Sequence, residues 1–462
     1  MNVYGDAGSC LTCLAARIAL GLVLVFGGIS IASAQQQQQE EQQQIESSTE
    51  QGATEIDQSD LSGPQPDGTL VRTPSEELAP FWRDSKFSAQ ARTFYFDRDK
   101  YDDTSSEAWA IGGSFTYRSG YLADFLRFGA TAYTSQPLYA PDDKDGTLLL
   151  QPGQEGYTVL GQWYGEVKFT DRIFGAIGAK EYNTPYINKN DVRMTPNTFE
   201  GATIYGTAGG TDGAPEVRFG GGYIAKIKEK NADDFKWMSQ SAGATVDRGV
   251  SVAGANLKYG DFAIGAAEYY SDDIINIFYA ESKYALPLGE TTRLSFAAQF
   301  AEQHSVGDDL LTGASFSTNQ WGLKSDLALG PTLLTLAYTD TADGANMRAP
   351  WSGYPGYTSV QVKDFNRASE RAVLARAAYD FSSIGAPGWS TYVLYVHGSG
   401  VESPNYNENE TDFNLQWTPK GGALRGLSFR LRYAYIEQRG GGDPNINDLR
   451  FIVNYDFPRP GE

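Results

Sequence analysis

Two arginines near the C-terminal end of the chain, Arg430 and Arg432, occupy alternate positions in a segment that is otherwise mostly apolar. In an extended strand, alternate side chains point to the same side, so both guanidinium groups would share one face. A guanidinium keeps its charge at physiological pH and binds a carboxylate through two parallel hydrogen bonds. A wall that carries such charges selects solutes by the sign of their charge.

Residues for covalent or metal chemistry are scarce by comparison. The two cysteines, Cys10 and Cys13, lie in an N-terminal segment that we expect to be removed, which leaves no thiol nucleophile and no thiolate ligand. The two histidines, His304 and His397, are not spaced in a way that indicates a Ser-His-Asp site or a metal site. We therefore predict no catalytic residue, no cofactor and no metal site, and we interpret the acidic stretches of the loops as solvated surface.

The N-terminal segment is typical of a secretory signal. An apolar run over residues 18–32 ends in the small-residue sequence Ala-Ser-Ala, a typical cleavage site. We predict a signal peptide over residues 1–34, with an uncleaved anchor as the alternative. Residues 35–80 are rich in Gln, Glu, Ser and Pro, and we expect a disordered periplasmic tail because they cannot bury enough apolar surface to fold. The remaining domain spans residues 81–462.

The composition argues against one class of function and favours one architecture. The chain has a net charge of −20, which counts against nucleic-acid binding because that requires a basic surface. It contains 51 Gly, 28 Tyr and 24 Phe. After the signal, no stretch approaches the roughly 20 apolar residues of a membrane-spanning helix. A chain of this kind suits a β-barrel, in which apolar residues occupy alternate positions and never form a continuous run.

Alternation of apolar and polar residues begins near Phe81 and continues to the end of the chain. It is clearest over residues 426–436 and 449–457, where aromatic residues end the apolar face, as expected at the interfaces of a bilayer. The connections between such segments are alternately short and long. The long ones, which we interpret as external loops, cover residues 97–107, 135–156, 182–201, 226–247, 303–317, 341–370, 400–410 and 438–446.

These features predict an all-β fold, a transmembrane antiparallel β-barrel of about 18 strands that begins near Phe87. We expect the apolar faces to contact lipid. The second faces are built from Gly, Ala, Ser, Thr and single charges, with few bulky apolar groups, and we expect them to line a wet lumen.

Several segments resemble the OprD family of outer-membrane porins. They are DSKFSAQARTFYFDRD from Asp84, SGYLADFLRFGATAYTSQPLY from Ser119, YNTPYINKNDVRMTPNTFEG from Tyr182, and the final LSFRLRYAYI and NDLRFIVNYDF. The matches are spread over residues 81–457. The resemblance implies a monomeric channel for water-soluble nutrients, typically amino acids and other small carboxylate-bearing compounds. It also implies that the third external loop folds into the pore.

The resemblance further implies a ladder of basic side chains on one wall of the pore. By position, this ladder would consist of Arg92, Arg430, Arg432 and Arg450. All four also fall on the lumen face by alternation, which supports the assignment independently. Arg98 and Arg376 are further candidates. For each arginine, simple pairing with a lumen acid is the alternative role.

The inward-folded loop supplies the other predicted site residues. Asp191 and Arg193 would form an ion pair that pins the loop to the wall. Tyr182 and Tyr186 would either line the constriction or merely pack the loop. Acids that face the ladder would orient a zwitterionic solute, and the candidates are Asp191, Asp412 and Asp456.

We therefore predict a porin in the outer membrane of a Gram-negative bacterium that passes small polar solutes passively. Its other partners would be outer-membrane lipid, lipopolysaccharide and the barrel-assembly machinery, with no nucleic acid. Two alternatives stay open. A barrel enzyme, such as a protease or lipase, would need a catalytic site at His304 or His397. A surface adhesin would use its external loops, above all residues 341–370, which contain Trp351, Tyr354 and Tyr357.

Overall fold

The computed structural model describes residues 79–457, except 103, 212, 403–405, 420 and 441–443. The predicted signal peptide and residues 35–78 of the predicted tail lie outside the described residues. A short helix, α3 (Pro80–Arg83), already begins at the end of the predicted tail. Within the described ranges, no helix has both the length and the apolar character needed to cross a membrane.

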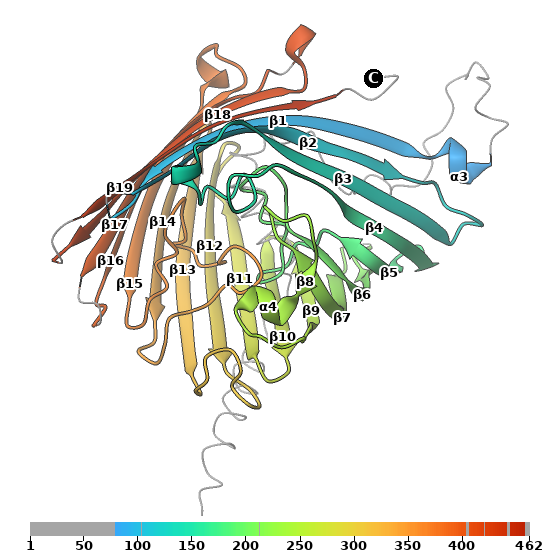
Figure 1. The fold of residues 1–462 in the computed structure, drawn as a ribbon, viewed down its shortest axis with the longest axis horizontal. Helices are drawn as coiled ribbons and strands as arrows, with labels where there is room; N and C mark the ends of the chain where they lie inside the picture. Colours follow the sequence, from blue (N-terminus) through green and yellow to red (C-terminus); the bar gives the residue numbers. More distant parts are fainter. Residues whose placement is uncertain are drawn as a thin grey trace, which may run out of the picture.

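Eighteen strands of the described chain form one closed antiparallel barrel (Figure 1). They are β1 (Lys86–Asp99), β2 (Ser105–Arg118), β3 (Leu126–Tyr139), β4 (Tyr157–Thr170), β5 (Ile173–Lys180), β6 (Thr198–Gly209), β7 (Glu216–Lys228), β9 (Val250–Tyr259), β10 (Phe262–Ser271), β11 (Ile275–Pro287), β12 (Thr292–His304), β13 (Ser317–Leu329), β14 (Thr332–Thr341), β15 (Arg371–Asp380), β16 (Trp389–Ser399), β17 (Asn407–Trp417), β18 (Leu427–Arg439) and β19 (Asn445–Asp456). Each strand pairs with the next, and β1 also pairs with β19, so no sheet edge is left open. The predicted fold class is confirmed.

Most connections alternate between short turns and long loops, as predicted. Gly260 and Gly330 sit in two-residue turns with φ of 60° and 57°, in the left-handed region that favours glycine. The alternation is not complete, and the exception is a connection at which no long loop was predicted. At the loop end of the barrel, β10 and β11 are joined by residues 272–274 alone, and no long loop lies there.

Side-chain exposure follows the predicted alternation. On β2, Ile111 and Phe115 are 45% and 54% exposed on the outer face, whereas Ala108 and Ala110 are buried inside. Aromatic rings collect at the ends of the outer face. Near the short-turn end, Trp417 stacks between two rings from the neighbouring strands, Trp389 and Phe429, with centroids 5.6 Å away on each side. Such a belt is typical of a barrel at the interface between lipid and water.

Three loops fold into the lumen. They are the constriction loop (residues 181–197), the helical loop (residues 229–249) and the long loop (residues 342–370). The helical loop contains β8 (Lys236–Trp237) and α4 (Met238–Ala242). The short 3-10 helices η3 (Asp142–Lys144), η4 (Phe381–Ile384) and η5 (Gly422–Leu424) lie in other connections.

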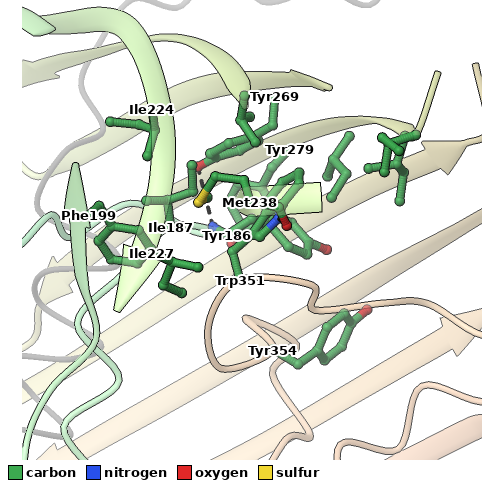
Figure 2. Packing of buried hydrophobic residues seen from close by; sticks show 14 of the residues in the cluster. Tyr186, Ile187, Phe199, Ile224, Ile227, Met238, Tyr269, Tyr279, Trp351 and Tyr354 are labelled. Carbon is green, nitrogen blue, oxygen red and sulfur yellow. Dashed lines mark hydrogen bonds between the residues drawn. The ribbon is translucent and has the colours of Figure 1, made fainter. Parts of the chain in front are cut away.

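The three loops meet in a hydrophobic cluster inside the barrel. Tyr186, Met238 and Trp351, one from each loop, are almost completely buried against the inner face of β6 to β12 (Figure 2). The indole Nε1 of Trp351 donates to the carbonyl of Met238 at 2.9 Å, and the amide of Tyr186 donates to the hydroxyl of Tyr269 at 3.3 Å. These bonds satisfy polar groups that burial would otherwise leave unpaired.

This cluster corrects the prediction that the inner face carries few bulky apolar groups. Ile275, Ile277 and Tyr279 of β11 all point inward and are buried. They contact the folded loops instead of water. The alternation pattern correctly predicted that these side chains face the lumen, but it did not predict that loops would cover them.

The lipid-facing and lumen-facing sides of one strand can be compared directly. Leu336 of β14 is 63% exposed on the outer face, and Leu333 lines the internal cavity described below. We expect Leu336→Arg to lower the free energy of unfolding in lipid vesicles by about 2–4 kcal/mol, because it places a charge in hydrocarbon. Leu333→Arg should cost much less, because water reaches that charge. Urea titration of both variants measures the difference, and equal losses would contradict the assignment of faces.

Candidate functional site

The part of the lumen that the loops do not fill is a cavity of about 750 Å³. Its wall is formed by the inner faces of β13 to β19 and β1, and its opposite side is formed by the three inward loops. The hydrophobic cluster therefore lies on one side of the lumen and the cavity on the other. A solute that crosses the barrel through this cavity passes between the strands of that wall and the loops.

Charge is distributed very unevenly in this cavity. Ten cationic side chains contribute to its lining, namely Arg92, Arg98, Lys189, Arg193, Lys230, Lys324, Arg376, Arg430, Arg432 and Arg450. Four carboxylates do so, namely Asp191, Asp326, Asp364 and Asp412. The lining thus has an excess of six positive charges, within a chain whose net charge is −20. Such an excess attracts anions into the cavity.

The predicted arginines of β18 and β19 lie together on the wall. Arg432 and Arg450 are directly opposite one another in the register of β18 and β19. Arg430 Nε donates to Asn414 at 2.7 Å, and Arg432 Nη2 donates to the hydroxyl of Tyr392 at 3.3 Å. These two neutral partners orient the guanidinium groups, and Arg432 also interacts electrostatically with the carboxylate of Asp412 on β17.

Arg450 and Arg98 share one counterion. Arg450 Nε lies 2.7 Å from one oxygen of Asp448, and Arg98 Nε lies 2.6 Å from the other. One carboxylate between two guanidinium groups leaves a net positive charge. Arg450 also donates to the carbonyl of Gln361 at 3.1 Å, which ties the long loop to the wall.

Arg92 has a different role from the other predicted members of the ladder. Its Nη1 lies 2.6 Å from Asp191 and 2.7 Å from the carbonyl of Arg193, and its Nε donates to Asn454. Arg92 therefore fastens the constriction loop to the wall at the junction of β1 and β19. Burial raises the pKa of Asp191, but the charge and hydrogen bonds of Arg92 outweigh this and hold the pKa below its ordinary value.

The expected ion pair between Asp191 and Arg193 is wrong, because Asp191 pairs with Arg92. Arg193 donates to the carbonyls of Thr147 and Val192 at 2.8 Å and lies over the ring of Phe96. Both residues do pin the loop, through partners outside it. Tyr182 and Tyr186 pack the loop: Tyr186 is fully buried, and Tyr182 packs at the edge of the same cluster.

The sequence analysis did not predict that the long loop contributes to the pore. It supplies residues 359–362 and Asp364, among others, to the cavity lining, and two acids of β17 hold it in place. Asp412 accepts from the amide of Gln361 at 3.1 Å, and Glu410 accepts from the amides of Val362 and Lys363 at 2.8 Å. Asp412 thus lies on the same wall as the ladder and does not face it.

Two other expectations are settled by position. Asp456 accepts from Gln90 at 2.9 Å and is not part of the cavity lining. The loop aromatics that an adhesin would expose, Trp351, Tyr354 and Tyr357, are buried inside the barrel. The suggestion that they present a binding surface is therefore wrong.

The histidines show no catalytic arrangement in the described structure. Nδ1 of His397 is 2.7 Å from the side-chain oxygen of Asn409 on the next strand, and His304 ends β12 opposite Ser317. Among the described residues, no group of three or more His, Cys, Asp or Glu side chains is placed to hold a metal ion.

Lys230, from the helical loop, is a cation of the lining that sequence reasoning missed. Burial and the positive charges of Arg193 and Arg450 lower the pKa of Lys230 to about 8, although Glu229 and Asp364 act in the opposite direction. The guanidinium groups of Arg193 and Arg450 keep their charge at this pH. Their repulsion disfavours the protonated form of Lys230. The low pKa of Lys230 therefore reflects first its burial and then the positive charges around it.

A family model described as outer membrane porin, OprD family, matches residues 79–459. The chain belongs to this family. A curated relative, the porin-like protein GalP of Pseudomonas putida, is 24% identical over 403 residues, which are 83% of this chain and 94% of the relative. The resemblance inferred from the sequence segments is confirmed, and with it the general function, passage of solutes through an outer-membrane barrel.

Solved porins share the fold of this OprD-family chain. A BenF-like porin from Pseudomonas fluorescens Pf-5 superposes with a TM-score of 0.73 at 19% identity, over 82% of this chain and 99% of that one. OccK9 (OpdG) of Pseudomonas aeruginosa superposes with a TM-score of 0.73 at 21% identity, over 82% of this chain and 100% of that one. OpdK of the same species superposes with a TM-score of 0.70 at 20% identity, over 82% of this chain and 99% of that one.

The charge of Lys230 gives the porin a measurable pH dependence. Raising the pH through about 8 deprotonates Lys230, so we expect the preference for anions to fall over that range, while the arginines keep their charge. Reversal potentials in a salt gradient across a planar bilayer measure the preference. The Lys230→Met channel should prefer anions less than the parent at neutral pH, and its preference should not change with pH over this range. The Lys230→Arg channel should keep its preference for anions over the same range. If the anion preference of Lys230→Met still fell near pH 8 as in the parent, a group other than Lys230 would be responsible for the pH dependence.

Proposed function

We propose that this porin conducts small solutes that carry a carboxylate, and that the cationic cavity is their path. The observation that carries the proposal is the excess of six positive charges in the lining of a chain that is acidic overall. An excess of this sign lowers the energy of an anion inside the cavity. We place the protein in the outer membrane of a Gram-negative bacterium, as a monomer assembled by the barrel-assembly machinery.

The geometry supports transfer of a carboxylate along the wall in short steps. Arg432 lies two residues from Arg430 on one face of β18 and opposite Arg450 on β19. A carboxylate bound to one guanidinium can therefore reach the next before it leaves the first. Each arginine already has a protein partner, in Asn414, Tyr392 or Asp448, so a solute competes with existing bonds and stays weakly bound. Weak binding at several sites permits release and flow.

Passage of amino acids as zwitterions receives less support. The acid expected to face the ladder from the loop, Asp191, is bound to Arg92, and Asp412 is bound to the long loop on the ladder side. A solute ammonium would thus meet few available carboxylates. The similar OpdK structure contains vanillate, a carboxylate without an ammonium group. Simple organic or aromatic acids fit the described lining best.

Planar-bilayer recordings test the proposal. We expect an anion-selective channel whose current is reduced by benzoate and not by neutral sugars of similar size. In the double variant Arg430→Gln with Arg432→Gln, the concentration of benzoate needed for half block should rise on the order of tenfold, because two charge-assisted contacts are lost.

Arg293→Gln is the matched control, because Arg293 is 52% exposed, pairs with Asp261 at the short-turn end and does not line the cavity. This variant should behave like the parent. A cation-selective parent channel would overturn the proposal. So would block by benzoate that is the same in the parent and the double variant.

A further inference from the structure

The cavity wall has two sectors of opposite character. The sector formed by β17, β18, β19 and β1 is mostly polar and basic, with Asn, Gln and Ser side chains between the ladder arginines and with Phe94 and Ile452 as its apolar members. The sector formed by β14, β15 and β16 is largely apolar. Its inward side chains that line the cavity include Leu333, Leu374, Leu394 and the ring of Tyr392. A purely charge-selective pore would need no such apolar sector.

One cation stands in the middle of the apolar sector. Arg376 of β15 lies directly opposite Leu394 in the register with β16, and Leu374 is its neighbour on the same face of the strand. Its guanidinium lies over the ring of Tyr392, with 4.3 Å from Cζ to the ring centroid. Tyr392 in turn accepts a hydrogen bond from Arg432, so the apolar sector joins the ladder at this ring.

The donors of Arg376 are not satisfied by the protein. The side chain is 9% exposed, and its Nε and Nη2, which are themselves shielded from solvent, have no hydrogen-bond partner among the described residues. These two nitrogens form one edge of the planar guanidinium, the edge that binds a carboxylate through two parallel bonds. Buried donors without an acceptor are costly, so the side chain gains by turning this edge to an acceptor in the cavity.

We propose that Arg376, Tyr392, Leu374 and Leu394 form a subsite that selects acids with a hydrocarbon body over polyhydroxylated acids of the same size. The proposal rests on the proposed function and specifies its substrate class. The side chain of Arg376 turns its Nε and Nη2 edge toward the cavity and binds the carboxylate there, and the body of the solute lies against the two leucines. Arg432, bonded to the same tyrosine, receives the carboxylate in the next step.

The selectivity would arise because a hydrocarbon body and a hydroxylated body differ in binding free energy on the same apolar surface. Hydrocarbon that leaves water for contact with leucine side chains gains free energy with each methylene that is buried. A hydroxyl at the same place loses its water without finding a partner, because a leucine side chain neither donates nor accepts a hydrogen bond. Tyr357 and Val360 of the long loop belong to the same packed cluster as the leucines and also line the cavity, so a solute at this sector contacts both the wall and the loop.

A matched pair of solutes separates this subsite from simple charge attraction. Cyclohexanecarboxylate and quinate share one carbon skeleton and one carboxylate, and quinate adds hydroxyl groups to the ring. We expect cyclohexanecarboxylate to half-block the chloride current of the parent channel at a concentration lower by about tenfold or more than quinate.

Two substitutions test the residues. Leu394→Asn keeps the side-chain size and should bring the two blocking concentrations to within about twofold of each other, by weakening the block by cyclohexanecarboxylate. Arg376→Gln should weaken the block by cyclohexanecarboxylate more than the block by quinate. Leu288→Asn, the same change at a 55% exposed turn residue outside the cavity, should leave the ratio unchanged. The chloride conductance of each variant shows that the recorded channels are folded.

The outcomes distinguish the subsite from the general function. Equal block of the parent by both acids, or a ratio that survives Leu394→Asn, overturns the subsite and leaves carboxylate conduction intact. Failure of both acids to block an otherwise conducting parent overturns carboxylate conduction itself. Preference for cyclohexanecarboxylate that is lost in Leu394→Asn and kept in Leu288→Asn supports the subsite.

Discussion

Hydrocarbon offers no partner to a backbone amide or carbonyl, and this constraint shapes the whole molecule. A sheet can meet it only by closing on itself, as β1 does when it pairs with both β2 and β19. Closure fixes one face of every strand toward lipid and the other toward the lumen. A charged side chain on the outer face costs several kcal/mol at the middle of the bilayer, so arginines near the middle of the strands point inward, whereas Arg371 and Arg439 face outward near strand ends. The membrane thus explains why charged side chains gather on the inner face, while the excess of cations over acids there is a property of this sequence.

The same logic explains what could be predicted from the sequence. The strands, their faces and the final pair of strands were all accessible, because alternation is local and lipid enforces it. The lumen positions of Arg430, Arg432 and Arg450 followed from it. Alternation does not say what an inward side chain will meet. Ile275 and Ile277 lie on the predicted face, yet they are buried in a hydrophobic cluster with loops that are distant in the sequence.

The site was predictable only in part for the same reason. Asp191 and Arg193 are close in sequence, but an irregular loop gives no rule for which neighbours pair, and Arg92 from the first strand is the partner of Asp191. Lys230 and the long loop carried no signal of a place in the pore, since their positions depend on three loops folding together. Net charge was equally uninformative: a total of −20 conceals a cavity with the opposite sign.

The central claim is that the cationic cavity between the barrel wall and the three loops holds the carboxylate of a passing solute. Crystals of the porin soaked in 4-bromobenzoate test it most directly, because the bromine gives an anomalous signal that locates the ligand. The account predicts bromine density inside the cavity, with the carboxylate directed to one of the arginines of the wall. Bromine density confined to the outer surface or the loops, with an empty cavity, would contradict it.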